Sequence, residues 1–359
     1  MVDQKLVPVL AQLSQDENPG IRAAAAECLW ALSRSFRALR VALGEPEVAE
    51  HLLALLGDGS ESVRTHASAA LCNMSMEYLP VKEQLLAAGT IPRFAAMALD
   101  SSTGPELRIN ALWALKNLTF GAGSKYKRAV TAALPWESLV RLVKGPDLPV
   151  AEQALAVLRN LTHGEPSETR EVFEWSQGKL PTLLLDEMPP ADAAAWKRSS
   201  HALYVAANLA TGFEDIKDGL MTLGLGRKIA WALQEDRHPD VQVAALWCVI
   251  NLAWQDTTKV ALRSSPRAAA IAAAAVAAAS GQAGVGPSSP SSGGVAARAA
   301  QLQALGVDGM VARLASDKSL SVHVSERAKN AQDVLQRALG HRPGQQQQQP
   351  AEAEAAGPS

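Results

Sequence analysis

The sequence predicts an all-α fold, a right-handed α-solenoid of about seven stacked repeats, of which the first is partial. Three observations lead to this prediction. Hydrophobic residues make up 48% of the 359 residues but aromatic residues only 4%, and alanine and leucine, both strong helix formers, dominate the apolar content. A short motif recurs along the chain at a nearly constant spacing. Each period contains three segments of helical character, separated by short turns.

The recurring motif is clearest in RINALWALKNLTF, residues 108–120, where an alanine stands six residues before the asparagine Asn117. Four more copies share this arrangement, and successive asparagines lie 44, 43, 48 and 43 residues apart. Two weaker copies place Arg34 and Arg337 at the asparagine position. A period of about 43 residues with two or three helices is typical of armadillo and HEAT solenoids. The five asparagines are Asn73, Asn117, Asn160, Asn208 and Asn251.

One complete period is clearest between residues 80 and 120. We expect a short helix over 80–88, a turn at Gly89, a second helix over 91–99 and a long third helix over about 105–120. Glycine at the turn allows the left-handed backbone that often ends a helix. The period therefore predicts three helices per repeat.

The repeats divide the chain into four segments. Armadillo repeats are predicted over residues 1–263. An insertion over 264–298, rich first in alanine and then in glycine, serine and proline, is expected to be largely disordered. The last armadillo repeat follows over 299–340. The tail, 341–359, is polar, lacks core-forming residues and is expected to be disordered.

The segment KLVPVLAQL, residues 5–13, resembles the second helix of a repeat whose first helix is missing. We expect its apolar residues to form an uncapped end, which solenoids normally avoid. This indicates either a fragment of a longer chain or an end that a partner covers. The apolar residues are Leu6, Val9, Leu10 and Leu13.

The third helix of each repeat has two functional faces. On a helical wheel, Ala111, Leu115 and Leu118 share the packing face, whereas Trp113 and Asn117 point elsewhere, toward the inner, concave surface of a solenoid. An asparagine there could pair with the backbone of an extended peptide, or bond to a neighbouring helix and fix the stack. The predicted partner-binding residues of this groove are Trp30, Arg34, Asn73, Asn110, Trp113, Asn117, Asn160, His201, Tyr204, Asn208, Trp247, Asn251 and Trp254.

Composition and motif content argue against several function classes. The formal net charge of -2 provides no basic field for nucleic acid, and no apolar run is long enough to span a membrane. The seven histidines show no metal-ligand spacing, and neither a phosphate loop nor a nucleophile elbow occurs. We therefore expect no enzyme activity, cofactor, metal or small-molecule substrate. Three cysteines, Cys28, Cys72 and Cys248, are expected as small buried residues in a reducing compartment.

Several longer segments together resemble the armadillo repeat-containing protein 8 family. They are CLWALSRSFRALR (28–40), LCNMSMEYLPVKEQLLAAG (71–89), RINALWALKNLTF, VLRNL (157–161), LWCVINLAW (246–254) and LQALGVDGMVARLASDKSLSVHVSERAKNAQDVLQ (302–336). The resemblance is collinear over about residues 5–340, apart from the insertion, and is to the C-terminal half of the family's chain.

The resemblance implies a function for the chain. That family is the armadillo subunit of the GID/CTLH ubiquitin ligase, and its C-terminal half holds the substrate-receptor subunit on the concave face. The chain would then be a non-catalytic adaptor that binds receptor and scaffold subunits, supports ubiquitination and proteasomal degradation, and resides in the cytoplasm and nucleus. The matching concave residues are Trp113, Asn117, Asn160, Tyr204, Asn208, Trp247, Asn251 and Trp254.

Two other interpretations remain open. One is a generic armadillo peptide-binding or structural scaffold. The other is a nuclear-import adaptor, which uses Trp-x-x-x-Asn pairs in consecutive repeats. Here the array is broken, because the residues four before the asparagines are Ala69, Trp113, Ala156, Tyr204 and Trp247.

Overall fold

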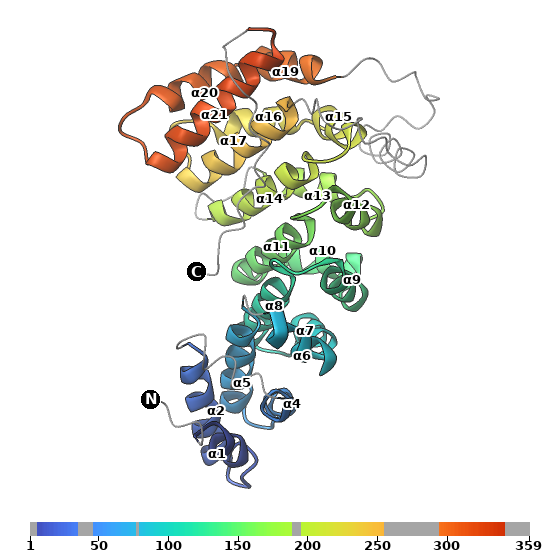
Figure 1. Ribbon diagram of the computed structural model, residues 1–359, viewed down its shortest axis with the longest axis vertical. Coiled ribbons are helices and arrows are strands. Elements are labelled where there is room, and N and C mark those ends of the chain that lie inside the picture. The colour runs from blue at the N-terminus through green and yellow to red at the C-terminus, as the bar shows by residue number, and fades with distance from the viewer. Residues whose placement is uncertain (1–5, 35–45, 77–78, 189–194, 255–293, 342–359) are drawn as a thin grey trace. The chain divides into compact units, whose positions relative to one another are not determined.

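The computed structural model describes residues 6–34, 46–76, 79–188, 195–254 and 294–341. Within these ranges all regular secondary structure is helical (Figure 1). Successive helices stack as the sequence predicts, so the chain is an all-α solenoid. The predicted insertion up to residue 293 and the tail beyond residue 341 lie outside the described residues.

The described helices follow a repeating order in which two short helices precede one long helix, and the first two repeats are described by their second and third helices. The first helices are α6 (Leu79–Ala87), α9 (Ser124–Ala133), α12 (Pro166–Trp175), α15 (Glu214–Thr222) and α19 (Val295–Ala304). The second helices are α1 (Leu6–Leu13), α4 (Pro46–Leu55), α7 (Thr90–Leu99), α10 (Trp136–Val143), α13 (Leu180–Asp186), α16 (Leu225–Ala232) and α20 (Val307–Ser316). The third helices are α2 (Pro19–Ser33), α5 (Glu61–Met74), α8 (Pro105–Thr119), α11 (Leu148–Thr162), α14 (Trp196–Leu209), α17 (Pro239–Ala253) and α21 (Val322–Ala338).

The helix boundaries follow the turn residues of the sequence. The helices α6, α7 and α8 confirm the three helices expected between residues 80 and 120. Gly89 precedes α7 with φ 76°, a left-handed conformation that a side chain would strain. Gly306 precedes α20 in the same way with φ 74°. Prolines at the first turn, as in α2 and α8, start third helices without losing a backbone hydrogen bond.

The described residues form two compact units, one up to Asn160 and one from Leu161 onward. Below we call them the N-terminal unit and the C-terminal unit. Each has its own core of leucine and alanine from the packing faces of its helices, for example Leu71 and Leu115 in the first and Leu203 and Leu246 in the second. The buried alanines allow close approach of neighbouring third helices.

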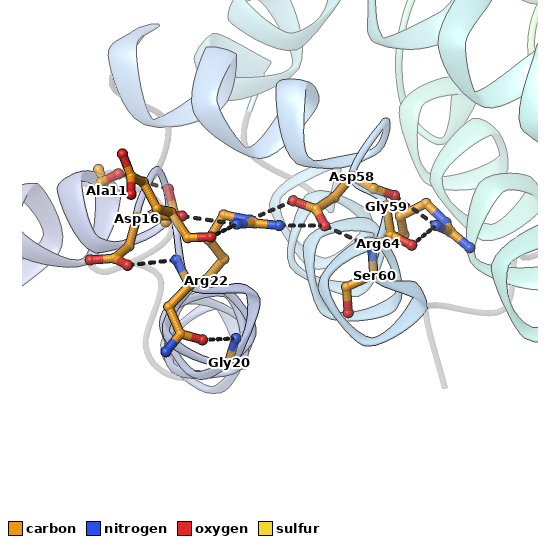
Figure 2. A network of polar contacts seen from close by, with 11 residues as sticks. Ala11, Asp16, Gly20, Arg22, Asp58, Gly59, Ser60 and Arg64 are labelled. Atoms are coloured by element: carbon orange, nitrogen blue, oxygen red, sulfur yellow. Dashed lines mark hydrogen bonds and ion pairs between the residues drawn. The ribbon is translucent and has the colours of Figure 1, made fainter.

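Arginines hold the loops before the third helices in the N-terminal unit (Figure 2). Arg22 of α2 donates through Nε and Nη2 to the Asp58 carboxylate at 2.7 and 3.1 Å, and through Nη1 to the Asp16 carbonyl at 2.9 Å. The hydrogen bond from Arg22 holds the pKa of Asp58 below its ordinary value. Arg64 of α5 donates to the Asp58 and Gly59 carbonyls at 2.6 and 3.2 Å. These contacts join α2 to the loop between α4 and α5.

Basic side chains of the second helices donate hydrogen bonds to carbonyls at or just beyond the C-terminal end of the preceding second helix. Arg93 of α7 donates to the Leu53 carbonyl of α4 at 2.9 Å in the N-terminal unit. In the C-terminal unit, Lys228 of α16 donates to the carbonyl of Met188, and Arg313 of α20 donates to the carbonyl of Leu233 at 3.0 Å. Each cation thereby satisfies a carbonyl at a helix C-terminus, where the helix dipole favours positive charge.

The last repeat begins at Val295, earlier than the predicted boundary at residue 299. The reason is Arg298, which is buried although it was assigned to the insertion. Its Nε donates to the Leu252 carbonyl at the end of α17 at 3.0 Å, and its Nη groups form ion pairs of 2.6 Å with Glu214 and Asp218 of α15. This network fixes α19 against α15 and α17.

The N-terminal helix exposes part of its apolar surface, as the sequence predicts. Leu6, Val9 and Leu13 of α1 are exposed. Leu10 differs from the prediction, because it is buried where α1 packs against α2 and α4. The exposed residues therefore form a narrower strip than the sequence suggests.

The three cysteines are unpaired thiols, but they are not all buried. Cys28 of α2 is exposed, which corrects the expectation for that residue, whereas Cys72 and Cys248 are buried. Burial raises the pKa of Cys72 to about 12 and raises the pKa of Cys248 as well. Two of the three thiols are therefore held as inert, neutral groups.

Thiol titration tests this difference. A thiol reagent at about pH 8 should modify one of the three cysteines, Cys28, in the native chain, because only a thiolate that solvent can reach reacts. All three should react after denaturation. Rapid modification of Cys72 or Cys248 in the native chain would contradict the described burial.

Replacing Arg298 tests the ionic network. Arg298→Met should destabilise the C-terminal unit by about 2–3 kcal/mol, because Asp218 loses its countercharge and Glu214 keeps only Lys217, while solvent still reaches both carboxylates in part. Hydrogen exchange should rise first in α15 and α19. As a control, Lys125→Met breaks an exposed ion pair with Glu83 and should change little. Equal effects of the two substitutions would show that Arg298 does not anchor the repeat.

Candidate partner-binding face

Asparagines of the third helices connect neighbouring repeats. Each amide nitrogen donates a hydrogen bond to the third helix of the repeat before it, and we call this set of bonds the asparagine ladder. In the N-terminal unit the bonds are Asn73 to the Ser33 hydroxyl at 2.9 Å, Asn117 to the Cys72 carbonyl at 3.2 Å and Asn160 to the Lys116 carbonyl at 2.9 Å.

The C-terminal unit contains the same type of contact. Asn208 donates to the Thr162 hydroxyl at 3.3 Å, and Asn251 donates to the Ala207 carbonyl at 2.9 Å. Both asparagines are buried, as are Asn117 and Asn160 in the other unit. The geometry therefore favours the stacking interpretation for these four residues over pairing with a partner's backbone.

Asn110 also serves the stack. Its amide nitrogen donates to the Ser68 hydroxyl of α5 at 3.0 Å, and the side chain is buried. The predicted groove position of Asn110, one helical turn before Trp113, is thus occupied by a second bond between α5 and α8. Beyond the first turn of α8, the Trp113 ring is the most exposed side chain of the helix.

The structure changes the register of α2. In three repeats the acceptor carbonyl belongs to the residue directly before the ladder asparagine. Asn73 instead donates to the Ser33 hydroxyl, which itself donates to the Trp30 carbonyl at 2.6 Å. The Trp30 carbonyl thus takes the acceptor position, so the residue after it, Ala31, holds the ladder position of α2. The motif had placed Arg34 there, but Arg34 lies almost one turn further on and is exposed.

Two aromatic residues on the third helices of the N-terminal unit have a cation beside them. Trp113 of α8 is 37% exposed, and the Lys116 ammonium lies 5.9 Å from its ring centroid. Trp30 of α2 is partly exposed, with the Arg34 guanidinium 5.3 Å and the His66 ring 5.6 Å from its centroid. We call these the two cation–aromatic pairs. Together with the half-buried Asn73, they are the parts of the predicted groove in this unit that solvent reaches.

The predicted residues of the C-terminal unit are less open. His201, Tyr204 and Trp254 are half-buried. Trp247 is only 2% exposed, because the Arg327 guanidinium of α21 lies 3.6 Å from its ring centroid. The expectation that Trp247 forms an open rung like Trp113 is therefore corrected: a side chain from the last repeat covers it.

Two basic residues outside the predicted groove, Lys116 and Arg159, stand directly before two ladder asparagines. Burial lowers the pKa of Lys116, and the positive charge of Arg159 lowers it further. Arg159 itself is buried. The sequence does contain a signal for these two cations, because a basic residue directly precedes the asparagine in two consecutive repeats, as KN at 116 and RN at 159.

In the part of the chain that the structure describes, no cluster of three or more histidine, cysteine, aspartate or glutamate side chains could hold a metal ion. No described helix combines the length and the apolar character that crossing a membrane requires.

Comparisons with known proteins agree with the solenoid. A family model described as HEAT repeats matches residues 1–72. Armadillo repeat-containing protein 8 of Mus musculus is 30% identical over 246 residues, which are 68% of this chain and 35% of that protein. GID complex subunit 5 of Schizosaccharomyces pombe is 27% identical over 222 residues, 62% of this chain and 28% of that protein. The chain thus spans about a third of the length of these relatives.

Solved structures share the fold. A designed armadillo repeat protein, solved in complex with the peptide (KR)4, matches with a TM-score of 0.57 at 16% sequence identity. The match covers 80% of this chain and 99% of the designed protein. At this identity the similarity establishes the fold alone.

The asparagine ladder can be tested by truncation. Asn117→Ala should lower the free energy of unfolding by about 1–2 kcal/mol, because a buried amide and its carbonyl partner lose their hydrogen bond. Asn73→Ala should cost less, because Asn73 is only half-buried and its partner is a hydroxyl that already bonds within α2. Urea unfolding followed by circular dichroism measures both. A larger loss for Asn73→Ala would contradict the ladder as the stacking contact.

Proposed function

The chain is an armadillo-repeat protein and a relative of armadillo repeat-containing protein 8, and from this relationship we propose that it is a non-catalytic adaptor of a GID/CTLH-type ubiquitin ligase. The observation that carries the proposal is the similarity to two differently named relatives, armadillo repeat-containing protein 8 and GID complex subunit 5. The latter is named as a subunit of such a complex.

In this proposal the exposed parts of the third helices bind the substrate-receptor subunit, and other surfaces contact scaffold subunits. Bringing the receptor to the ligase supports ubiquitination and proteasomal degradation of the receptor's substrates. The chain acts in the cytoplasm and nucleus. It contributes no catalytic residue, cofactor or small-molecule site.

The geometry supports an adaptor because the third-helix face combines rigidity with accessible rings. The asparagine ladder fixes the spacing of neighbouring third helices, so little ordering entropy is lost when a partner binds. Trp113 offers a large apolar surface at little conformational cost, and tryptophan is enriched among residues that dominate binding. Trp113 is therefore the residue expected to contribute most.

Electrostatics argue against a nuclear-import adaptor. Import signals of the basic kind would bring lysine and arginine side chains close to Lys116 and Arg159, two cations on neighbouring helices. Like charges brought together across an interface weaken binding.

Reconstitution tests the proposal. The full chain is purified with the receptor and scaffold subunits of the same organism's ligase, and complex formation is followed by size-exclusion chromatography and calorimetry. We expect a single complex, and we expect Trp113→Ala to weaken receptor binding by roughly tenfold or more, as for a central tryptophan contact. Leu79→Ala, which trims another exposed apolar residue away from the third helices, is the matched control.

Two outcomes would count against the proposal. Absence of any complex with these subunits would remove the adaptor function. A complex that forms equally well with Trp113→Ala would leave a scaffold whose receptor does not use the third-helix face.

A further inference from the structure

A pair of cations lies on two neighbouring third helices of the N-terminal unit. Lys116 of α8 and Arg159 of α11 each directly precede a ladder asparagine. The bond from Asn160 to the Lys116 carbonyl, at 2.9 Å, ties the two helices together at this point. The two positive charges are thus held close by the packing of the repeats.

The charge of Lys116 is not neutralised by its surroundings. Among the residues that the structure describes, none forms an ion pair or a hydrogen bond with its ammonium group. The groups around it are the Trp113 ring at 5.9 Å, the buried Cys72 thiol and the repelling charge of Arg159. Burial lowers the pKa of Lys116, because loss of hydration disfavours the charged form of the ammonium group. A half-buried cation without an anion favours a ligand that supplies one.

The second cation–aromatic pair repeats this arrangement on α2. The Arg34 guanidinium lies 5.3 Å from the Trp30 ring centroid, and Arg34 is exposed. Both pairs belong to the N-terminal unit, and both place a cation next to a ring that solvent reaches. A ligand that fits both pairs carries anionic groups for the cations and apolar groups for the rings along one chain.

We propose that the third-helix face of the N-terminal unit binds an extended acidic segment of a protein partner, which places a carboxylate at Lys116 and an apolar side chain on Trp113. The proposal rests on the proposed function, in that this face contacts a protein. Charge complementarity selects the acidic class: a carboxylate would pair with a cation that the fold leaves without an anion. The net charge of -2 and the apolar ring beside Lys116 favour a peptide over a nucleic acid.

Matched peptides test the proposal. Three fluorescein-labelled, amidated octapeptides, (EF)4, (QF)4 and (KF)4, share length and aromatic content and differ in charge. Their binding to the full chain is measured by fluorescence anisotropy at low and high salt. We expect (EF)4 to bind most tightly and (KF)4 least. Added salt should weaken (EF)4 and leave (QF)4 almost unchanged.

Substitutions locate the effect. Lys116→Met keeps an unbranched side chain and removes the charge, so it should weaken (EF)4 roughly tenfold, to the level of (QF)4. Lys116→Arg should retain the preference and serves as the informative variant if Lys116→Met does not fold. Lys125→Met removes an equal charge from α9 and should leave all three affinities unchanged. Trp113→Ala should weaken (EF)4 and (QF)4 together.

Several results would overturn the inference. Equal binding of (EF)4 and (QF)4, tightest binding of (KF)4, no binding of any peptide, or an unchanged (EF)4 affinity in Lys116→Met would each show that no carboxylate is bound at this lysine. These outcomes do not decide the adaptor function, which depends on the reconstituted complex. Conversely, selective (EF)4 binding without a ligase complex would retain the acidic site and remove the adaptor.

Discussion

The stacking of the third helices depends on one interaction, the hydrogen bond from an asparagine amide of one repeat to the third helix of the repeat before it. The alanine six residues before each of these asparagines is fully buried, and its small side chain lets neighbouring helices approach until the amide reaches its acceptor. A buried amide without a partner would cost several times what the bond contributes. Each bond therefore fixes both the distance and the register between two repeats.

Basic side chains complete the stack at the helix ends. Lys82 of α6 donates to the Asn117 and Phe120 carbonyls at the end of α8, and Arg298 of α19 donates to the Leu252 carbonyl at the end of α17. The last carbonyls of a helix have no partner within it, and cations satisfy them where the helix dipole is negative. Lysine and arginine, which in the sequence look like surface charges, therefore also hold neighbouring helices together in the fold.

This use of polar groups decides what remains for partners. The asparagines are committed to the stack, so the accessible chemistry of the third-helix face consists of rings and the cations beside them. Trp113 and Trp247 show how far equivalent motif positions can diverge. Trp113 stays open to solvent, whereas the guanidinium of Arg327 covers Trp247. In a repeat protein, a binding role must therefore be assigned to each residue from its own surroundings, because residues at the same motif position can differ in exposure.

The sequence by itself determined the helix class, the period and the bounds of α6, α7 and α8, because these follow from local propensity, turn glycines and a motif repeated five times. It also identified the asparagines but left their role open. Only the tertiary structure decided that they bond to the preceding helix, that Ala31 and not Arg34 takes the ladder position of α2, and that Arg298 anchors the last repeat. These features depend on contacts between residues about one or two periods apart, and the register of such contacts is set by how close two helices pack, which no single repeat encodes.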